Sequence, residues 1–174
     1  FEEEADKTAM KEGFKHSFSS KQKKTFALIG FMATGKTSVC KLLAKKLNYS
    51  FIDIDEEIVK HAGMPITEIF AQQGEDAFRT MESSILSKFI HLEETVLSCG
   101  GGIILREANR TLLREQALTT WLYNSIETSV ERGNDGSRPL LNTANPTERA
   151  NKLFNERLGF YASAADLCIS TEHK

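Results

Sequence analysis

A glycine-rich segment that ends in Lys36 and Thr37 carries the clearest chemical signal of the sequence. Residues 30–37 read GFMATGKT, which matches the pattern G-x-x-x-x-G-K-[ST]. In such a segment backbone N–H groups turn inward around phosphate oxygens, the lysine reaches the β- and γ-phosphates, and the threonine hydroxyl binds Mg²⁺. A glycine-rich turn with a solvated lysine is the alternative, but an apolar strand pattern precedes the segment and an amphipathic helix pattern follows it. The sequence therefore predicts a nucleoside triphosphate site, whose residues are Gly30, Ala33, Thr34, Gly35, Lys36, Thr37 and Ser38.

Two carboxylates lie at the end of the next strand pattern, which reads FIDID over residues 51–55. In an extended strand Asp53 and Asp55 point to one side and the isoleucines point to the other. Because open α/β sheets bind ligands at the carboxyl ends of their strands, we expect both carboxylates beside the phosphate segment. There Asp53 can bind Mg²⁺, directly or through water, and Asp55 can orient or deprotonate an attacking hydroxyl. Helix capping or simple solvation is the alternative for this pair.

Two further groups of residues each allow two interpretations. Glu75, Arg79 and Glu82 share one face of a helix pattern, and their spacing alone favours a ladder of surface salt bridges. Gly100–Gly102 follow a strand pattern. Three consecutive glycines are costly in chain entropy, so they indicate that the backbone approaches another group closely, with a flexible turn as the alternative.

A long segment without periodicity covers residues 133–145 and contains Arg138 next to Pro139. Loops of this length often act as lids, and an arginine in a lid can move onto transferring phosphates when the lid closes. An ordinary exposed arginine is the alternative. Arg157, in the last helix pattern, gives no signal by itself.

Short apolar runs alternate with longer amphipathic stretches from Thr25 onward, a pattern typical of an α/β fold with a parallel sheet between two layers of helices. We expect strands near residues 25–30, 49–53, 95–99, 119–123 and 166–170. We expect helices near residues 36–47, 55–62, 66–72, 75–92, 107–116, 125–132 and 147–164. The last helix has the clearest start, because Asn145 can cap it and Pro146 suits its first turn.

The composition excludes several classes of protein. A chain of 174 residues can bury a core without disulfides or a structural metal. The 22 basic and 24 acidic residues give a net charge of -2, far from the basic excess of a nucleic-acid-binding protein. No apolar run is long enough to span a membrane and no secretory signal is present, so we expect a cytoplasmic protein. Cys40, Cys99 and Cys168 lie within or at the end of apolar segments, where we expect buried, reduced thiols.

The first residues differ from the rest of the chain. An acidic run at Glu2–Glu4 opens residues 1–24, and lysines close this segment. We expect an N-terminal extension of unknown role over residues 1–24 and a single domain over residues 25–174.

Taken together, these motifs resemble the shikimate kinase family over residues 25–170, nearly the whole chain outside the extension. Six ordered motifs are far more specific than one phosphate segment. They read GFMATGKT, FIDIDEEI, GMPITEIFAQQGEDAFRTMES, VLSCGGGIIL, RPLL and RLGFYASAADL.

The resemblance implies a fold and a reaction. The fold is a three-layer P-loop kinase architecture with a lid loop and a five-stranded parallel sheet of order 2-3-1-4-5. The reaction is transfer of the γ-phosphoryl group of ATP, with Mg²⁺, to the 3-hydroxyl of shikimate in aromatic amino acid biosynthesis. We expect a monomer whose partner is a small molecule, with no nucleic acid and no membrane.

The resemblance also implies roles for individual residues. Lys36, Asp55 and Arg138 would be catalytic, and Thr37 and Asp53 would bind the metal. Arg132 would pack against adenine, and Glu82 would hold Arg79 in place. Residues that bind shikimate would be Asp55, Arg79, Gly100, Gly101, Gly102 and Arg157.

The sequence departs from the family pattern in small ways. Gly159 stands where the family often has proline, and this difference affects the end of the last helix and the direction in which Arg157 points. The stretch from Arg132 to Arg138 varies in length in such proteins, which concerns the contact of Arg132 with adenine. Two other functions stay open at this point. One is a kinase for another small metabolite on the same scaffold, and the other is a catalytically silent relative that acts as a binding protein.

Overall fold

A five-stranded parallel sheet forms the centre of the molecule in the computed structural model, which describes residues 23–133 and 145–172. The strand order β2-β3-β1-β4-β5 is the predicted one. Each strand lies within one residue of its predicted range at both ends. The strands are β1 (Thr25–Ile29), β2 (Ser50–Asp53), β3 (Thr95–Ser98), β4 (Leu118–Tyr123) and β5 (Leu167–Ser170).

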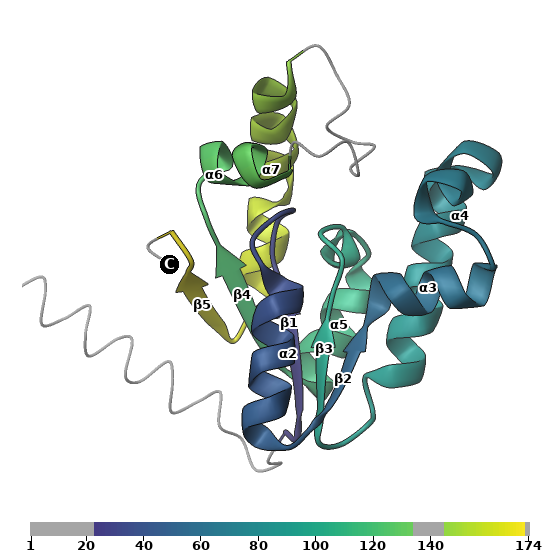
Figure 1. Ribbon diagram of the computed structural model, residues 1–174, viewed down its shortest axis with the longest axis vertical. Coiled ribbons are helices and arrows are strands. Elements are labelled where there is room, and N and C mark those ends of the chain that lie inside the picture. Colours follow the sequence, from purple (N-terminus) through teal and green to yellow (C-terminus); the bar gives the residue numbers. More distant parts are fainter. Residues whose placement is uncertain (1–22, 134–144, 173–174) are drawn as a thin grey trace, which may run out of the picture.

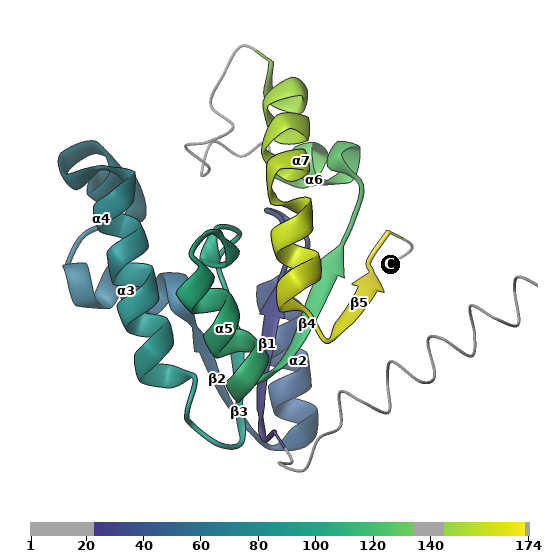
Figure 2. The same cartoon turned by 180° about the vertical axis from the view of Figure 1, so that it is seen from behind.

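Helices cover both faces of the sheet, as the pattern predicts. The helix α2 lies on one face (Figure 1), and α4, α5 and α7 lie on the other, which is seen from behind in Figure 2. The α-helices among the described residues are α2 (Lys36–Leu47), α3 (Ile54–Ala62), α4 (Ile66–Phe89), α5 (Glu107–Gln116), α6 (Ile126–Gly133) and α7 (Pro146–Ala164). A short 3₁₀ turn, η1 (Ile103–Leu105), precedes α5.

The central strands are apolar on both faces because each face packs against a helix layer. On β1, Leu28 joins a small core with Cys40 and Ala44 of α2, while Ala27 and Ile29 join the larger core on the other face. Successive side chains of β1 point to opposite faces of the sheet, and both faces are buried. Such strands are typical of parallel sheets in α/β proteins. The sheet thus holds the strand ends, where the candidate residues lie, on a rigid base.

A break at Gly74 divides α4 into two helical pieces. Gly74 has φ 83° and ψ 171°, a conformation that is open to glycine and costly for other residues. This explains why the sequence pattern reads as two helices, near residues 66–72 and 75–92. The second piece ends at Phe89, three residues earlier than predicted.

The start of α7 has the predicted cap. The side chain of Asn145 accepts a hydrogen bond from the Glu148 N–H at 3.3 Å, and Pro146 is the first helical residue. Residues 134–144 lie outside the described part of the chain, and so do residues 1–22, which make up most of the predicted extension.

One of the three cysteine predictions is wrong. Cys40 and Cys99 are buried, but Cys168 is exposed. Cys168 lies on β5, an edge strand whose last three residues are all exposed, so an apolar run there does not mean burial. No helix among the described residues is long and apolar enough to cross a membrane.

The core packing gives a first prediction. Leu113 on α5 is fully buried and Leu42 on α2 is 57% exposed. We expect Leu113→Ala to lower the free energy of unfolding by about 2–5 kcal/mol, because it leaves a cavity. Leu42→Ala makes the same chemical change at an exposed helical site, and we expect it to cost less than about 1 kcal/mol. Urea denaturation of both variants checks this, and equal losses would contradict the assignment of the core.

Candidate active site

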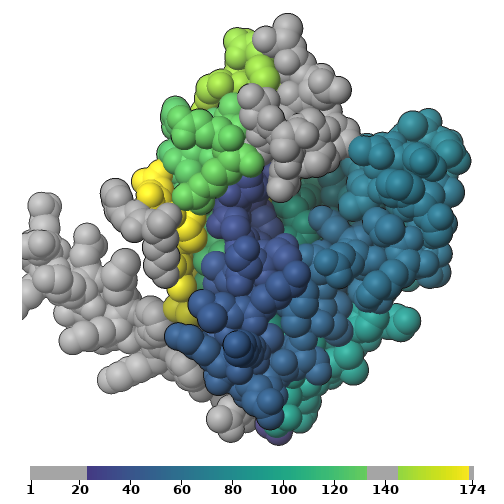
Figure 3. Space-filling model, in the orientation of Figure 1, coloured from purple at the N-terminus to yellow at the C-terminus, as the bar shows by residue number. Residues whose placement is uncertain are grey.

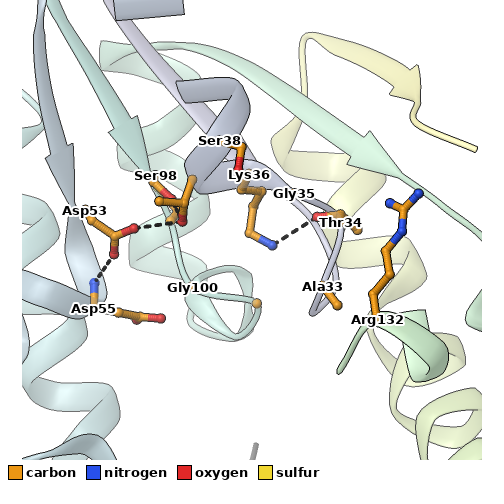
Figure 4. Close-up of a pocket in the computed structure, with 13 residues that line it drawn as sticks. Ala33, Thr34, Gly35, Lys36, Ser38, Asp53, Asp55, Ser98, Gly100 and Arg132 are labelled. Carbon is orange, nitrogen blue, oxygen red and sulfur yellow. Dashed lines mark hydrogen bonds between the residues drawn. The ribbon is translucent and has the colours of Figure 1, made fainter. Parts of the chain in front are cut away.

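A polar pocket of about 290 Å³ opens at the carboxyl edge of the sheet. On this side of the molecule, α2 lies between the part of the chain that holds α6 and the part that holds α3 and α4 (Figure 3). Side chains and backbone from four separate segments converge in the pocket (Figure 4). Its lining residues are Ala33, Thr34, Gly35, Lys36, Thr37, Ser38, Asp53, Asp55, Ser98, Cys99, Gly100, Gly101 and Arg132.

The glycine-rich segment forms the loop that its pattern predicts, between the end of β1 and the start of α2. Gly35 has φ 81° and immediately precedes α2, so the loop turns sharply into the helix, and the first residues of α2 line the pocket. The ammonium group of Lys36 lies over the loop. It donates to the Gly30 carbonyl at 2.9 Å, to the Phe31 carbonyl at 2.6 Å and to Thr34 Oγ1 at 3.1 Å. A positive charge and a helix N-terminus therefore share this end of the pocket.

Gly30 is required for a different reason. It has φ 152°, and a Cβ at this position would lie 2.3 Å from the Leu122 carbonyl oxygen of β4. The absence of a side chain lets the loop leave the sheet directly beside the neighbouring strand. Gly30 thus shapes the loop from behind and does not itself line the pocket.

Three oxygen-bearing side chains meet below the loop. The hydroxyl of Thr37 donates to Asp53 Oδ2 at 3.0 Å and lies 3.3 Å from Ser98 Oγ. Such oxygen atoms are the ligands that Mg²⁺ prefers. Among the described residues no cluster of three His, Cys, Asp or Glu side chains could hold a metal ion, so a metal here would depend on Thr37, Asp53, water and phosphate oxygens together.

The carboxylates of Asp53 and Asp55 both line the pocket, but not as neighbours on one strand. The strand β2 ends at Asp53, whose Oδ1 accepts from the Asp55 N–H at 3.0 Å and caps α3. Asp55 therefore lies in the first helical turn. The predicted strand geometry is wrong at Asp55, and the capping alternative is right for Asp53, which also binds Thr37.

The surface ladder that spacing alone favours is wrong for Arg79 and Glu82, which are buried, whereas Glu75 is exposed. Arg79 is 7% exposed and Glu82 is 1% exposed. One guanidinium nitrogen of Arg79 donates to Glu82 Oε2 at 2.9 Å, and another donates to Glu75 Oε1 at 3.1 Å. Helical spacing correctly predicts the two pairs, but it carries no information about what covers them.

The three consecutive glycines cover this buried pair. A Cβ on Gly102 would lie 2.3 Å from Nη1 of Arg79, and a Cβ on Gly100 would lie 2.8 Å from Asp55 Oδ1 and 3.1 Å from Glu82 Oε1. The flexible-turn alternative is therefore excluded at these two positions. The backbone lies directly against one guanidinium and two carboxylates because it carries no side chains there.

The carbonyl of Gly101 points to α7. It accepts from the hydroxyl of Tyr161, and Nη1 of Arg157 lies 3.4 Å from it. Arg157 is 4% exposed. The glycine turn thus brings Arg79, from α4, and Arg157, from α7, to the edge of the pocket, although neither arginine lines the volume described above.

Burial controls the ionisation of Glu82. Desolvation raises the pKa of its carboxyl group to about 7, because burial outweighs the opposing charge of Arg79. The nearby carboxylate of Asp55 acts in the same direction, and Arg157 opposes it. Glu82 Oε1 has no hydrogen-bond partner within the described part of the chain, which agrees with the direction of this shift.

The buried thiols play no ionic role. Burial raises the pKa of Cys40 to about 12 and raises that of Cys99 well above its ordinary value. Both thiols stay protonated at neutral pH and are poor nucleophiles and metal ligands. Cys99 lines the pocket as a small apolar surface.

The structure brings together most of the predicted site residues. Arg132 lines the pocket from α6, whereas Arg138 lies outside the described residues. Sequence reasoning missed Ser98 and Tyr161. Ser98 could have been found as the last residue of a strand directly before the glycines, but Tyr161 lies near the end of a helix and gives no local signal.

Comparison with known proteins identifies close relatives. The family model described as shikimate kinase matches residues 32–174. A shikimate kinase of Neisseria gonorrhoeae is 42% identical over 145 residues, which are 83% of this chain and 85% of that protein. A shikimate kinase of Thermodesulfovibrio yellowstonii is 43% identical over 150 residues, 86% of each chain.

Solved structures agree with the sequence comparison. A shikimate kinase from Acinetobacter baumannii in complex with shikimate superposes with a TM-score of 0.85 at 33% identity, over 91% of this chain and 89% of that one. A shikimate kinase from Aquifex aeolicus gives a TM-score of 0.76 at 34% identity, over 86% and 88%. A gluconokinase from Sinorhizobium meliloti, at 18% identity and a TM-score of 0.52 over 89% of this chain and 86% of that one, shares the fold alone.

The raised pKa of Glu82 gives a prediction about stability. Between its ordinary value of 4.5 and about 7, the folded state holds the proton that the unfolded state loses, so this group makes the protein less stable as the pH rises. Glu82→Gln cannot ionise. We expect the loss of stability between about pH 5 and about pH 7.5 to be smaller in this variant by about 2 kcal/mol.

Urea denaturation at the two pH values measures this difference. Glu75→Gln is the matched control, because Glu75 also pairs with Arg79 but is exposed. Of the two variants, Glu82→Gln should show the smaller loss of stability between the two pH values. An unchanged pH dependence in Glu82→Gln would show that Glu82 is already ionised at low pH.

Proposed function

The chain belongs to the shikimate kinase family and phosphorylates shikimate with ATP, and we propose that the transfer takes place in the pocket between the phosphate loop and the glycine turn. One observation carries this proposal. The turn Gly100–Gly102 has Lys36 and Thr37 on its pocket side and the buried Arg79 and Arg157 against its backbone. A triphosphate and a small acid would therefore meet at one wall.

We propose that the loop binds the phosphates of ATP. Inward N–H groups, the N-terminus of α2 and the ammonium of Lys36 all favour negative charge at the same place. The carbonyls that now hold Lys36 keep it beside the pocket, and a γ-phosphate would compete for its protons. In phosphoryl transfer the protein mainly positions the groups and neutralises charge, so Lys36 would stabilise the transition state.

The residues below the loop fit Mg²⁺. Thr37 Oγ1 and Asp53 Oδ2 are 3.0 Å apart, and both belong to the polar wall of the pocket. When bound, the ion would neutralise charge on the β- and γ-phosphates. Thr37 would supply a hydroxyl ligand, and Asp53 would bind the ion directly or through water.

The acceptor would lie against the glycine turn. A planar guanidinium pairs with a carboxylate through two parallel hydrogen bonds, so Arg79 and Arg157 would orient the carboxylate of shikimate. Asp55 would orient the 3-hydroxyl and accept its proton. The hydroxyl oxygen would bond to the γ-phosphorus as the bond from this phosphorus to the bridging oxygen of ADP breaks.

Arginines complete the proposed nucleotide site. Arg132 lines the pocket and would pack against adenine, and Arg138 would act from the lid. We further propose a cytoplasmic monomer that acts without nucleic acid or membrane, with residues 25–174 as its single domain and residues 1–24 as an extension.

A direct assay tests the function. ADP release from Mg-ATP is measured in parallel with shikimate, gluconate, AMP or no acceptor. We expect release with shikimate alone. Release with gluconate or AMP instead would support another small-molecule kinase, and ATP binding without release would support a silent relative.

The glycine turn gives a prediction about shikimate binding. In Gly102→Ala the new methyl group lies 2.3 Å from Nη1 and 2.4 Å from Cζ of Arg79, so the guanidinium must move. We expect KM for shikimate to rise by more than about tenfold, while KM for ATP stays within about twofold.

Gly159→Ala is the control for this change. A Cβ at Gly159 meets nothing within 4 Å, and the residue lies inside α7 between Arg157 and Tyr161. Its kinetics should match the wild type. Equal increases in both KM values for Gly102→Ala would argue against a role of Arg79 toward shikimate.

The metal assignment gives a prediction about the dependence on Mg²⁺. Thr37→Val keeps the shape of the side chain and removes the hydroxyl that faces Asp53. We expect the Mg²⁺ concentration for half-maximal ADP release to rise by at least about tenfold. Shikimate affinity measured by calorimetry should stay unchanged. An unaltered Mg²⁺ dependence would remove Thr37 from the metal site.

A further inference from the structure

One face of α7 contacts both halves of the proposed site. Phe154, Arg157 and Tyr161 are spaced i, i+3 and i+7 and so share this face. The ring of Phe154 packs edge-on against Phe31 of the phosphate loop, with ring centroids 5.6 Å apart and an interplanar angle of 84°. Arg157 and Tyr161 reach the carbonyl of Gly101. A single helix face therefore lies against the phosphate loop at one end and the glycine turn at the other.

Burial and ring stacking hold the side chain of Tyr161 in place, in addition to its hydrogen bond. The residue is fully buried, and its ring stacks on Trp121 of β4 with centroids 5.6 Å apart and an interplanar angle of 13°. Trp121 is itself buried in the sheet. The ring thus has one orientation, and the hydroxyl group has one position relative to β4.

That position makes the Tyr161 hydroxyl a permanent donor. Burial raises the pKa of Tyr161 well above its ordinary value, and the neighbouring Arg157 only partly opposes this. The group therefore stays protonated around neutral pH, where it donates to the Gly101 carbonyl.

The Gly101 carbonyl differs from its neighbours in what it accepts: Gly100 and Gly102 accept within the turn from the Ile103 and Leu105 N–H groups, whereas Gly101 accepts from side chains of α7. Gly101 carries no side chain, and the Cβ position it leaves open lies 3.6 Å from both the Gly30 carbonyl oxygen and the Met32 nitrogen, and 3.7 Å from the Tyr161 hydroxyl. The contact from Arg157 is long, at 3.4 Å. Among the described contacts, the hydroxyl of Tyr161 is therefore the strongest one that sets the direction of this carbonyl.

We propose that Tyr161 is a positioning residue for shikimate, which acts by fixing the Gly101 carbonyl and, through this shared acceptor, the guanidinium of Arg157. The inference rests on the proposed function, since it needs Arg157 and the glycine turn to contact the acceptor. Tyr161 itself touches no reacting atom. Without the hydroxyl the Gly101 carbonyl loses its short donor and keeps only the long contact from Arg157, so the carbonyl and the guanidinium can shift together.

Tyr161→Phe tests this role with the smallest change available. Phenylalanine keeps the ring and its stacking on Trp121 and removes only the donor. We expect KM for shikimate to rise by about fivefold to tenfold, with kcat and KM for ATP within about twofold of the wild type. Far-UV circular dichroism should be unchanged.

Tyr123→Phe is the matched control. Tyr123 belongs to the same aromatic group, with its ring 5.9 Å from that of Trp121 and 6.0 Å from that of Phe154. These ring contacts do not involve the glycine turn, so the same loss of one hydroxyl should leave KM for shikimate unchanged. A purely structural role of Tyr161 would lower the melting temperature and leave both KM values as they are, which would overturn the proposal.

A double-mutant cycle with Arg157→Lys tests the route of the effect. Shikimate dissociation constants are measured by calorimetry for the wild type, both single variants and the double variant. If Tyr161 acts through the acceptor that it shares with Arg157, the combined increase is smaller than the product of the two single increases. A multiplicative result would overturn this part of the proposal. A wild type that neither binds nor phosphorylates shikimate would instead refute the proposed function.

Discussion

The close approach of backbone to charged side chains at Gly100–Gly102 is the constraint on which the proposed acceptor site depends. Arg79, Asp55 and Glu82 occupy the space that side chains on Gly100 and Gly102 would fill. Because the backbone excludes water there, the Arg79–Glu82 pair is buried, and burial in turn raises the pKa of Glu82. The glycine turn thus determines both the burial of the Arg79–Glu82 pair and the protonation of Glu82.

Local sequence was sufficient to predict the frame of the molecule. The strands and the glycine-rich loop before α2 are confirmed, because each depends on residues adjacent in the chain. The strand order is confirmed too, but it was implied by the family resemblance and not by local sequence. The hydrogen bond from Thr37 to Asp53 joins two such patterns. Parallel strands end at one edge of the sheet, so residues at two strand ends meet even without knowledge of their side chains.

The rest of the site depends on contacts between distant segments, which periodicity does not encode. The spacing alone suggested that Arg79 lies on the surface, because spacing shows which residues share a helix face but not what packs against that face. The backbone of Gly102 packs against Arg79. Tyr161 gave no signal because its partners, Trp121 and Gly101, lie on two other elements. The apolar run at Cys168 gave the opposite error, since β5 is the last strand of the sheet and, within the described residues, pairs with a strand on one side only.

Because Cys168 is exposed and the other two cysteines are buried, reagents that modify thiols react at Cys168, away from the pocket. Alkylating reagents and dissolved oxidants reach a sulfur atom on the surface far sooner than one sealed in the interior, and Cys40 and Cys99 are sealed. A maleimide dye added at low excess therefore marks β5 alone. The molecule consequently carries a natural site for immobilisation or fluorescence labelling on its sheet edge, with the buried thiol of Cys99 left untouched.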